Sequence, residues 1–159
     1  MTRVLIVYYS KTGNTEKMAK AVEQGVLSEG VGCILKRVEK TPVDELQKFH
    51  GVIIGSPTYF GTMATEIKKF IDESIKYFGK LEGKVAGAFT SSGALGGGNE
   101  TTVLDILQAL LIHGMIIQGK SKGGHHYGPV SIGKPDETIK KECNELGRRV
   151  ARLTKKLAI

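Results

Sequence analysis

The chain has little of several things that would place it in a specialised class of protein. Its 159 residues include no tryptophan, four prolines and two cysteines, and no apolar run approaches the roughly 18 residues of a membrane-spanning helix. Cys33 and Cys143 form no C-x-x-C pair, which argues against a disulfide framework and favours a reducing compartment. Because an apolar strand pattern begins at Val4, there is no room for a signal peptide. We therefore expect a cytoplasmic protein that does not bind membranes.

The composition predicts one globular domain over residues 1–159. Hydrophobic residues make up 40% and charged residues 25%, and a chain of this length can bury a sizeable core. The net charge of +7 raises the question of a nucleic-acid partner. However, many lysines and arginines are mixed with acidic residues in helical patterns, as in Lys140-Lys141-Glu142. We therefore predict a solvated basic face and no binding of nucleic acid.

Apolar runs and helical patterns alternate five times along the chain. The predicted strands are Val4–Tyr8, Gly32–Val38, Gly51–Gly55, Lys84–Ser91 and Met115–Gly119. The predicted helices are Asn14–Ser28, Pro42–Phe49, Thr65–Tyr77, Glu100–His113 and Pro135–Leu157. Near-continuous apolar strands indicate a parallel sheet that is buried on both faces. Five right-handed βα units predict an α/β fold, a doubly wound five-stranded parallel sheet of order 2-1-3-4-5 with helices on both faces.

In this strand order, ligands bind in the crevice beyond the carboxyl ends of the first and third strands. Three unusual loops follow strands at that edge of the sheet, namely Ser10–Thr15, Ser56–Met63 and Thr90–Asn99. We expect these three loops to meet and to form a binding site.

The first loop predicts an anion site. It joins a buried strand to a helix N-terminus and consists of Ser10, Lys11, Thr12, Gly13, Asn14 and Thr15. Amides, hydroxyls and the positive end of the helix dipole converge in such a turn, which suits a phosphate. The loop is not a Walker loop, a dinucleotide G-x-G-x-x-G loop or a phosphatase Cys-x5-Arg loop, so a monoester phosphate fits best. The alternative is an ordinary helix that Thr12 or Asn14 caps.

The other two loops suit a flat ring. The second consists of Pro57, Thr58, Tyr59, Phe60 and Gly61. Its two adjacent aromatic rings can flank a planar ligand, and the alternative is that one of them packs beneath the loop. The third consists of Ser91, Ser92, Gly93, Ala94, Leu95, Gly96 and Gly97. Its glycines permit the backbone to approach a ligand closely, and the alternative is a flexible surface loop. Asn99 with Thr102, or Glu100, would cap the following helix. A mononucleotide with a flat ring fits all three loops. FMN fits, and AMP fits physically too, although the loops suit a larger ring.

These loops resemble the flavodoxin superfamily, and the resemblance covers essentially the whole chain. Ser10–Thr15 is similar to the [ST]-x-T-G-N-T phosphate loop of flavodoxins. Other segments are similar to the WrbA family of NAD(P)H:quinone oxidoreductases: Pro57–Met63 to P-T-R-F-G-x-M, Ser91–Thr101 to S-T-G-T-G-G-G-Q-E-[QT], His113-Gly114-Met115 to H-H-G-M, and Tyr127-Gly128 to a later Y-G. The resemblance implies a flavodoxin-like fold, with the FMN phosphate at Ser10–Thr15 and the isoalloxazine beside Pro57–Gly61 and Ser91–Gly97.

The resemblance leaves two main functions open. One is a WrbA-like oxidoreductase that takes electrons from NAD(P)H to a quinone, with homo-oligomeric assembly an open question. The other is a flavodoxin that carries electrons between redox partner proteins without substrate turnover, and a flavin-binding regulatory module is a third hypothesis. The loops favour the enzyme. The short segment Val38–Leu46 favours the carrier, because WrbA chains have an insertion there, and Ile112 and Tyr59 replace a histidine and an arginine of the WrbA pattern.

The histidines give weaker signals. His125 and His126 lie in a glycine-rich segment and are expected in solvent, although they could instead reach the flavin or a nicotinamide. His113 closes a predicted helix, where the helix dipole favours a protonated ring. No histidine has further ligands at metal-site spacing, so the sequence predicts no metal centre.

Overall fold

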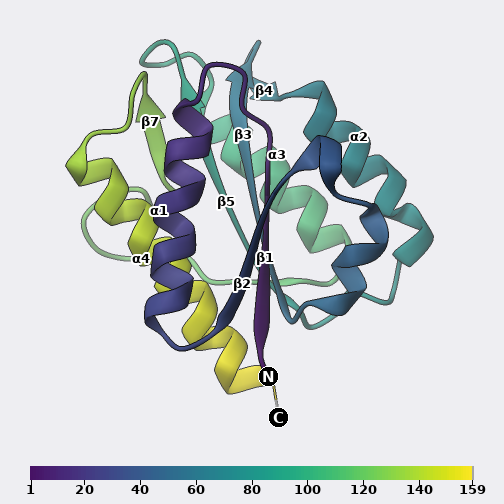
Figure 1. The fold of residues 1–159 in the computed structure, drawn as a ribbon. Coiled ribbons are helices and arrows are strands. Elements are labelled where there is room, and N and C mark those ends of the chain that lie inside the picture. Colours follow the sequence, from purple (N-terminus) through teal and green to yellow (C-terminus); the bar gives the residue numbers. More distant parts are fainter. Residues whose placement is uncertain (159) are drawn as a thin grey trace.

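The computed structural model describes residues 1–158, which form one mainly parallel sheet between two layers of helices (Figure 1). The strands are β1 (Arg3–Tyr8), β2 (Gly32–Arg37), β3 (Gly51–Tyr59), β4 (Thr62–Met63), β5 (Val85–Ser92), β6 (Ile116–Ile117) and β7 (Val130–Ile132). The α-helices are α1 (Asn14–Ser28), α2 (Thr65–Glu73), α3 (Asn99–Ile112) and α4 (Glu137–Leu157). Three 3₁₀-helices complete the fold, η1 (Val38–Lys40), η2 (Val43–Lys48) and η3 (Ser74–Tyr77).

The strand order confirms the predicted α/β fold. The strands lie in the order β2-β1-β3-β5-β6, which is the order 2-1-3-4-5 when the five predicted strands are numbered. All of these neighbours pair in parallel. Two further strands were not predicted: β4 pairs antiparallel with the end of β3, and β7 pairs parallel with the end of β5.

The predicted fifth strand, Met115–Gly119, is the least accurate prediction. Only Ile116 and Ile117 pair with β5, and the chain then leaves the sheet until β7 rejoins the other end of β5. Gly128 lies against the carbonyl of Ala88 in between, where any Cβ would overlap that oxygen. The edge of the sheet is therefore interrupted by residues 118–129, which leave the edge and return to it.

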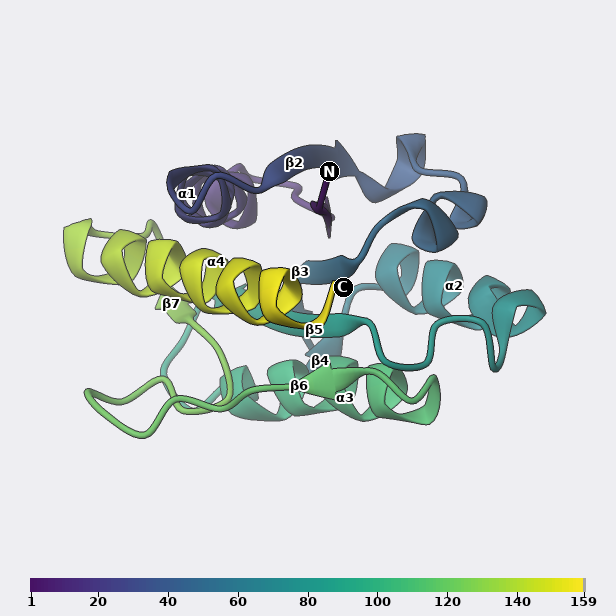
Figure 2. The same ribbon diagram turned by 90° about the horizontal axis from the view of Figure 1, so that it is seen from below.

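Alternation along the strands divides the core into two halves. Val4, Ile6 and Ile53 face α1 and α4, whereas Leu5 and Ile54 face α2 and α3. Figure 2 shows the two helix layers from below, on opposite sides of the sheet. Because side chains alternate between faces, these fully buried strands contribute to both halves, as their continuous apolar sequence predicts. Within residues 1–158, no helix combines the length and apolar character that a bilayer crossing requires.

The predicted helix Pro42–Phe49 forms only as the 3₁₀-helix η2. Pro42, in an extended conformation, precedes η2 as its N-cap residue. Within η2, only Val43 and Leu46 are buried. A helix of so few residues has little cooperative stability of its own, so packing decides its geometry. The α4 helix likewise begins later than predicted, because Asp136 caps it by accepting a hydrogen bond from the Ile139 amide at 2.8 Å.

Two glycines allow α1 and α4 to cross in close contact. A Cβ at Gly147 would overlap the carbonyl oxygen of Val22, and a Cβ at Gly25 would overlap that of Asn144. Both obstacles are backbone atoms, which cannot rotate away as a side chain can. The two helices approach this closely only because both positions lack a side chain.

We expect Gly147→Ala to lower the free energy of unfolding by about 1–3 kcal/mol, because the methyl group must push the two helices apart. Urea denaturation would measure the change. Lys141→Ala, at an exposed position of the same helix, is the control and should leave stability nearly unchanged. Equal stability of the two variants would mean that the helices do not cross as described.

His113 is buried and does not behave as a helix-end cation. Its Nε2 donates to Ser74 Oγ at 2.7 Å, since that hydroxyl itself donates to the Ile71 carbonyl at 2.6 Å. The Nδ1 atom is buried and has no partner within residues 1–158. Burial lowers the pKa of His113 from its ordinary value of 6.5. The prediction of a protonated ring is therefore wrong, because desolvation outweighs the helix dipole.

This burial predicts a pH dependence of stability. The unfolded chain binds a proton at His113 more readily than the folded chain does, so stability should fall as the pH drops below about 6.5. Gln at this position keeps a donor for Ser74 but does not titrate, and His113→Gln should therefore flatten the stability profile between about pH 7 and pH 5. His50→Gln, at an exposed histidine, is the control. An unchanged profile in His113→Gln would contradict this account.

Candidate functional site

The three loops meet at the carboxyl edge of the sheet and are tied together by side-chain hydrogen bonds. Thr15 Oγ1, in the first turn of α1, lies 2.8 Å from Ser91 Oγ at the end of β5. Thr58 Oγ1 and Thr90 Oγ1, at the ends of β3 and β5, lie 2.9 Å apart. The third loop thus contacts both others, and the predicted convergence of the three loops is confirmed.

The first loop is shaped by Gly13 and Ser10. Gly13 is the N-cap of α1 with a φ of 97°, a left-handed conformation that glycine adopts at little cost. The N-cap residue makes no side-chain capping bond, and neither Thr12 nor Asn14 caps the helix, so that alternative is wrong. Ser10 Oγ instead accepts the amides of Gly13 at 3.1 Å and Glu16 at 3.3 Å.

The same loop presents donors without acceptors. Among residues 1–158, no acceptor is recorded for four amides at the start of α1, those of Lys11, Thr12, Asn14 and Thr15. The Ser10 hydroxyl accepts two hydrogen bonds and keeps its own proton for donation. Free amides at a helix N-terminus, together with hydroxyls, form the donor set that binds a phosphate monoester. The geometry therefore fits the predicted phosphate loop.

Arg37 braces this loop from β2, a role that the sequence did not reveal. Its Nη2 donates to the Ser10 carbonyl at 2.7 Å and lies 3.0 Å from Glu39 Oε1. The hydrogen bond to Glu39 raises the pKa of Arg37, so the guanidinium stays charged. In the sequence Arg37 looked like an ordinary charged residue of an edge strand, because nothing local pairs it with Ser10.

The second loop is the tip of a β-hairpin. Strand β3 continues to Tyr59, and Phe60 and Gly61 form the turn with φ of 49° and 78°. Phe60 is fully exposed and Tyr59 is 40% exposed, so neither ring packs beneath the loop and that alternative is wrong. The hairpin is held at its base, where Thr62 Oγ1 donates to Asp105 Oδ2 of α3 at 2.6 Å. A rigid hairpin therefore presents two adjacent aromatic rings to solvent beside the first loop.

The third loop touches the second through glycine backbone. A Cβ at Gly98 would overlap the Cα of Gly61, so the loops approach more closely than other residues allow. Gly98, with φ of 97°, is the N-cap of α3 without a side-chain cap, and the predicted capping by Asn99, Thr102 or Glu100 is wrong. Asn99 Nδ2 donates back to Ser92 Oγ instead. Leu95 remains exposed at the tip of this loop.

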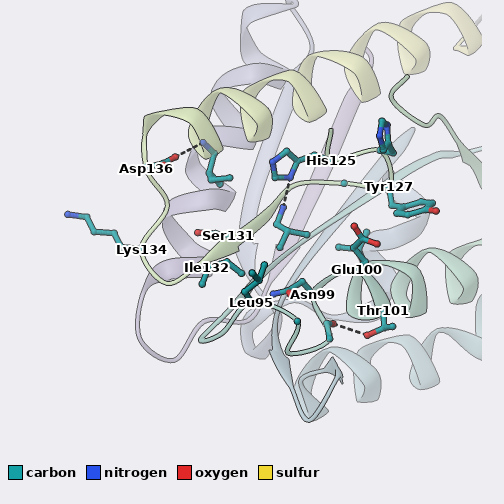
Figure 3. Close-up of a pocket in the computed structure, with 17 residues that line it drawn as sticks. Leu95, Asn99, Glu100, Thr101, His125, Tyr127, Ser131, Ile132, Lys134 and Asp136 are labelled. Atoms are coloured by element: carbon teal, nitrogen blue, oxygen red, sulfur yellow. Dashed lines mark hydrogen bonds between the residues drawn. The ribbon is translucent and has the colours of Figure 1, made fainter. Parts of the chain in front are cut away.

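A cavity of ≈ 750 Å³ opens beside the third loop (Figure 3). It lies between the start of α3, the segment His125–Gly128 and β7, and its lining includes no residue of the second loop. Its walls are mostly apolar, and they include Leu95, Val103 and Ile132. The interruption of the edge strand after β6 produces this space, because residues 118–129 leave the sheet and return over α3.

The two adjacent histidines have different positions. His126 is exposed, as predicted, and its Nδ1 donates to the Lys120 carbonyl at 2.7 Å. His125 is partly buried, so the prediction of a solvent position is wrong for it, and both histidines line the cavity. Its Nδ1 accepts the Val130 amide at 3.2 Å. That bond depends on the return of the chain to β7, which no local sequence signal shows.

The described residues offer neither a metal site nor a reactive thiol. Within residues 1–158, no three histidine, cysteine or acidic side chains cluster as metal ligands. Burial raises the pKa of Cys33 to about 12 and that of Cys143 to about 12, so both thiols stay protonated. A protonated thiol is a poor nucleophile, so neither cysteine is suited to thiol chemistry in this fold.

Comparison with known proteins identifies the family. A family model described as a flavodoxin domain matches residues 5–106. An NAD(P)H dehydrogenase (quinone) of Archaeoglobus fulgidus is 37% identical over an alignment of 190 residues that covers 99% of this chain and 100% of the relative. A flavodoxin of Aquifex aeolicus is 39% identical over 159 residues, covering 95% of this chain and 86% of the relative.

A solved structure supports the same assignment. The flavodoxin-like WrbA-like protein from Agrobacterium tumefaciens superposes with a TM-score of 0.85 at 25% identity, covering 98% of this chain and 99% of that chain. The resemblance predicted from the three loops is thereby confirmed. The chain belongs to the flavodoxin family, and its cofactor is FMN.

Proposed function

We propose that this protein is an FMN-dependent oxidoreductase of the WrbA kind, which transfers electrons from NAD(P)H to a quinone. The observation that carries the proposal is the apolar cavity beside the third loop. An electron carrier needs only an exposed flavin edge, whereas an enzyme needs a site for its substrate. The relationship to the NAD(P)H dehydrogenase (quinone) of Archaeoglobus fulgidus supports the same function.

In this proposal the first loop holds the FMN phosphate. The free amides of residues 11, 12, 14 and 15 and the hydroxyls of Ser10, Thr12 and Thr15 surround the anion, and the α1 dipole adds to the attraction. Lys11, the one cation of the loop, is exposed and adds charge from the solvent side. Most of the binding energy then comes from neutral donors that are already in position.

The isoalloxazine lies between the second and third loops. Pro57–Gly61 offers the rings of Tyr59 and Phe60, and Ser91–Gly97 offers backbone amides and carbonyls to the edge of the flavin. Full exposure of Phe60 is costly for so large an apolar ring unless a ligand or partner covers it. When bound, FMN supplies the hydride and electron chemistry, and these loops orient it and exclude water.

A second candidate is an electron-carrying flavodoxin, and one observation favours it. The alignment with the Archaeoglobus enzyme extends over 190 positions although this chain has only 159 residues, so that relative contains segments missing here. The alignment with the Aquifex flavodoxin has only 159 positions, although it covers 86% of that relative. A chain without those segments has fewer residues with which to enclose a substrate or to build an oligomer interface.

We also propose that residues 1–159 act as a single FMN-binding domain in the cytoplasm, without nucleic-acid or membrane partners. The basic C-terminal helix supports this view, because its charge is partly balanced within the fold. Arg152 and Arg148 both pair with Glu29, and their hydrogen bonds lower the pKa of that carboxyl to about 2. A homo-oligomer remains part of the enzyme proposal.

The phosphate assignment predicts a large loss of FMN affinity in the double variant Thr12→Val, Asn14→Ala. Hydrogen bonds to a charged group contribute about 1.5–3 kcal/mol each, so the loss of two should raise the dissociation constant on the order of 100-fold or more. Quenching of FMN fluorescence would measure it. Lys20→Ala, at an exposed residue of α1, is the control. Unchanged affinity in the double variant would reject the phosphate loop.

Steady-state kinetics separate the two candidate functions. The FMN-loaded enzyme should oxidise NAD(P)H with duroquinone as acceptor, with a turnover on the order of 1–10³ s⁻¹. Duroquinone is chosen because its fully substituted ring does not add to thiols. If turnover is absent and a reductive titration yields a stable one-electron-reduced flavoprotein, the carrier is correct and the enzyme proposal fails.

A further inference from the structure

His125 is held in an unusual backbone conformation at the wall of the cavity. Its φ is 51°, in the left-handed region that a residue with a side chain rarely adopts. The two preceding residues, Gly123 and Gly124, also have positive φ and adopt it readily. Within residues 1–158 the only other non-glycine residue with positive φ is Phe60, in the second loop. A histidine retained at a position that suits glycine points to a role for its side chain.

The hydrogen bond between Val130 of β7 and His125 fixes the tautomer of the His125 imidazole. Nδ1 of His125 accepts the Val130 amide, so this nitrogen carries no proton and the neutral ring has its proton on Nε2. Protonation of Nδ1 would bring two N–H groups against each other and break the bond. The imidazole is therefore arranged as a neutral donor, with Nε2–H as the donating group and no partner for it within residues 1–158.

Three of the polar side chains that line the cavity are already committed to hydrogen bonds within the fold. Asn99 donates to Ser92, Ser131 donates to the Gly133 carbonyl, and Asp136 accepts the Ile139 amide. In Figure 3 the Lys134 side chain and the Tyr127 hydroxyl both point away from the cavity. The His125 Nε2–H is therefore the donor best placed for a ligand among apolar walls.

We propose that His125 donates a hydrogen bond to a carbonyl oxygen of a quinone bound in this cavity and stabilises the negative charge that develops there. The inference rests on the proposed function and assigns this chain's own residue to its chemistry. A quinone accepts a hydride equivalent, supplied by NAD(P)H, and one proton, and becomes a hydroquinone. As the electrons arrive, charge builds on the carbonyl oxygen, and a fixed donor among apolar walls stabilises it. The proton then comes from water, because transfer of the Nε2 proton would leave an imidazolate anion.

His125→Asn tests the role with little disturbance of the loop. Asparagine tolerates positive φ, and its Oδ1 can accept the Val130 amide in place of Nδ1, but nothing replaces Nε2–H. His50→Asn changes an exposed histidine that does not line the cavity and is the control. Duroquinone binding to the oxidised, FMN-loaded protein without NAD(P)H can be followed by NMR of histidine-labelled protein, which reports the tautomer and the contact directly.

We expect NMR to find the Nε2–H tautomer of His125 and a shift of that signal on addition of duroquinone. His125→Asn should weaken duroquinone binding about tenfold, the worth of one hydrogen bond, and lower turnover on the order of 100-fold, while His50→Asn matches the wild type. Equal binding by wild type and His125→Asn, or a His125 signal that duroquinone leaves unmoved, would overturn the inference. A wild-type protein that binds duroquinone through His125 but shows no turnover would contradict the proposed function and leave this contact intact.

Discussion

The structure depends on four backbone amides at the start of α1 that no acceptor within residues 1–158 satisfies. They are held in place by Gly13, which turns the chain, by Ser10, which binds the neighbouring amides, and by Arg37, which fixes the Ser10 carbonyl from the adjacent strand. An exposed set of donors is stable in water, but it becomes strongly favourable once an anion replaces that water. In the proposed function, the fold provides this donor set before the cofactor arrives, so FMN binding would require little reorganisation of the loop.

The second and third loops are also held in place, in their case by contact between their backbones. Gly61 and Gly98 touch where no side chain would fit, and Thr101 Oγ1 donates to the Gly61 carbonyl at 2.8 Å. This contact leaves the exposed rings of Tyr59 and Phe60 on a braced hairpin, while Leu95 and its neighbours remain at the surface. A firm base and an open rim suit a site that must hold a flat cofactor and still admit a reaction partner.

The interrupted edge strand distinguishes this fold from a regular five-stranded parallel sheet. If β6 and β7 were one continuous strand, the segment His125–Gly128 would lie in the sheet and the cavity beside α3 would not exist. The interruption also gives His125 its bond to Val130 and its place in the wall. The feature that most favours an enzyme over a carrier therefore lies in the part of the fold that hydrophobic patterning describes least well.

The sequence by itself determined the order of the five main strands, the approximate places of the four α-helices and the three loops, because buried strands leave continuous apolar runs and phosphate turns need a short, specific set of residues. It also determined the family, through Ser10–Thr15 and the loop that contains Gly96–Gly98. Only the tertiary structure decided the split of the fifth strand, the brace from Arg37, the neutral state of His113 and the position and hydrogen bond of His125. Each of these depends on atoms that are remote in the sequence, and local patterns carry no information about which remote groups will desolvate a ring or accept its hydrogen bond.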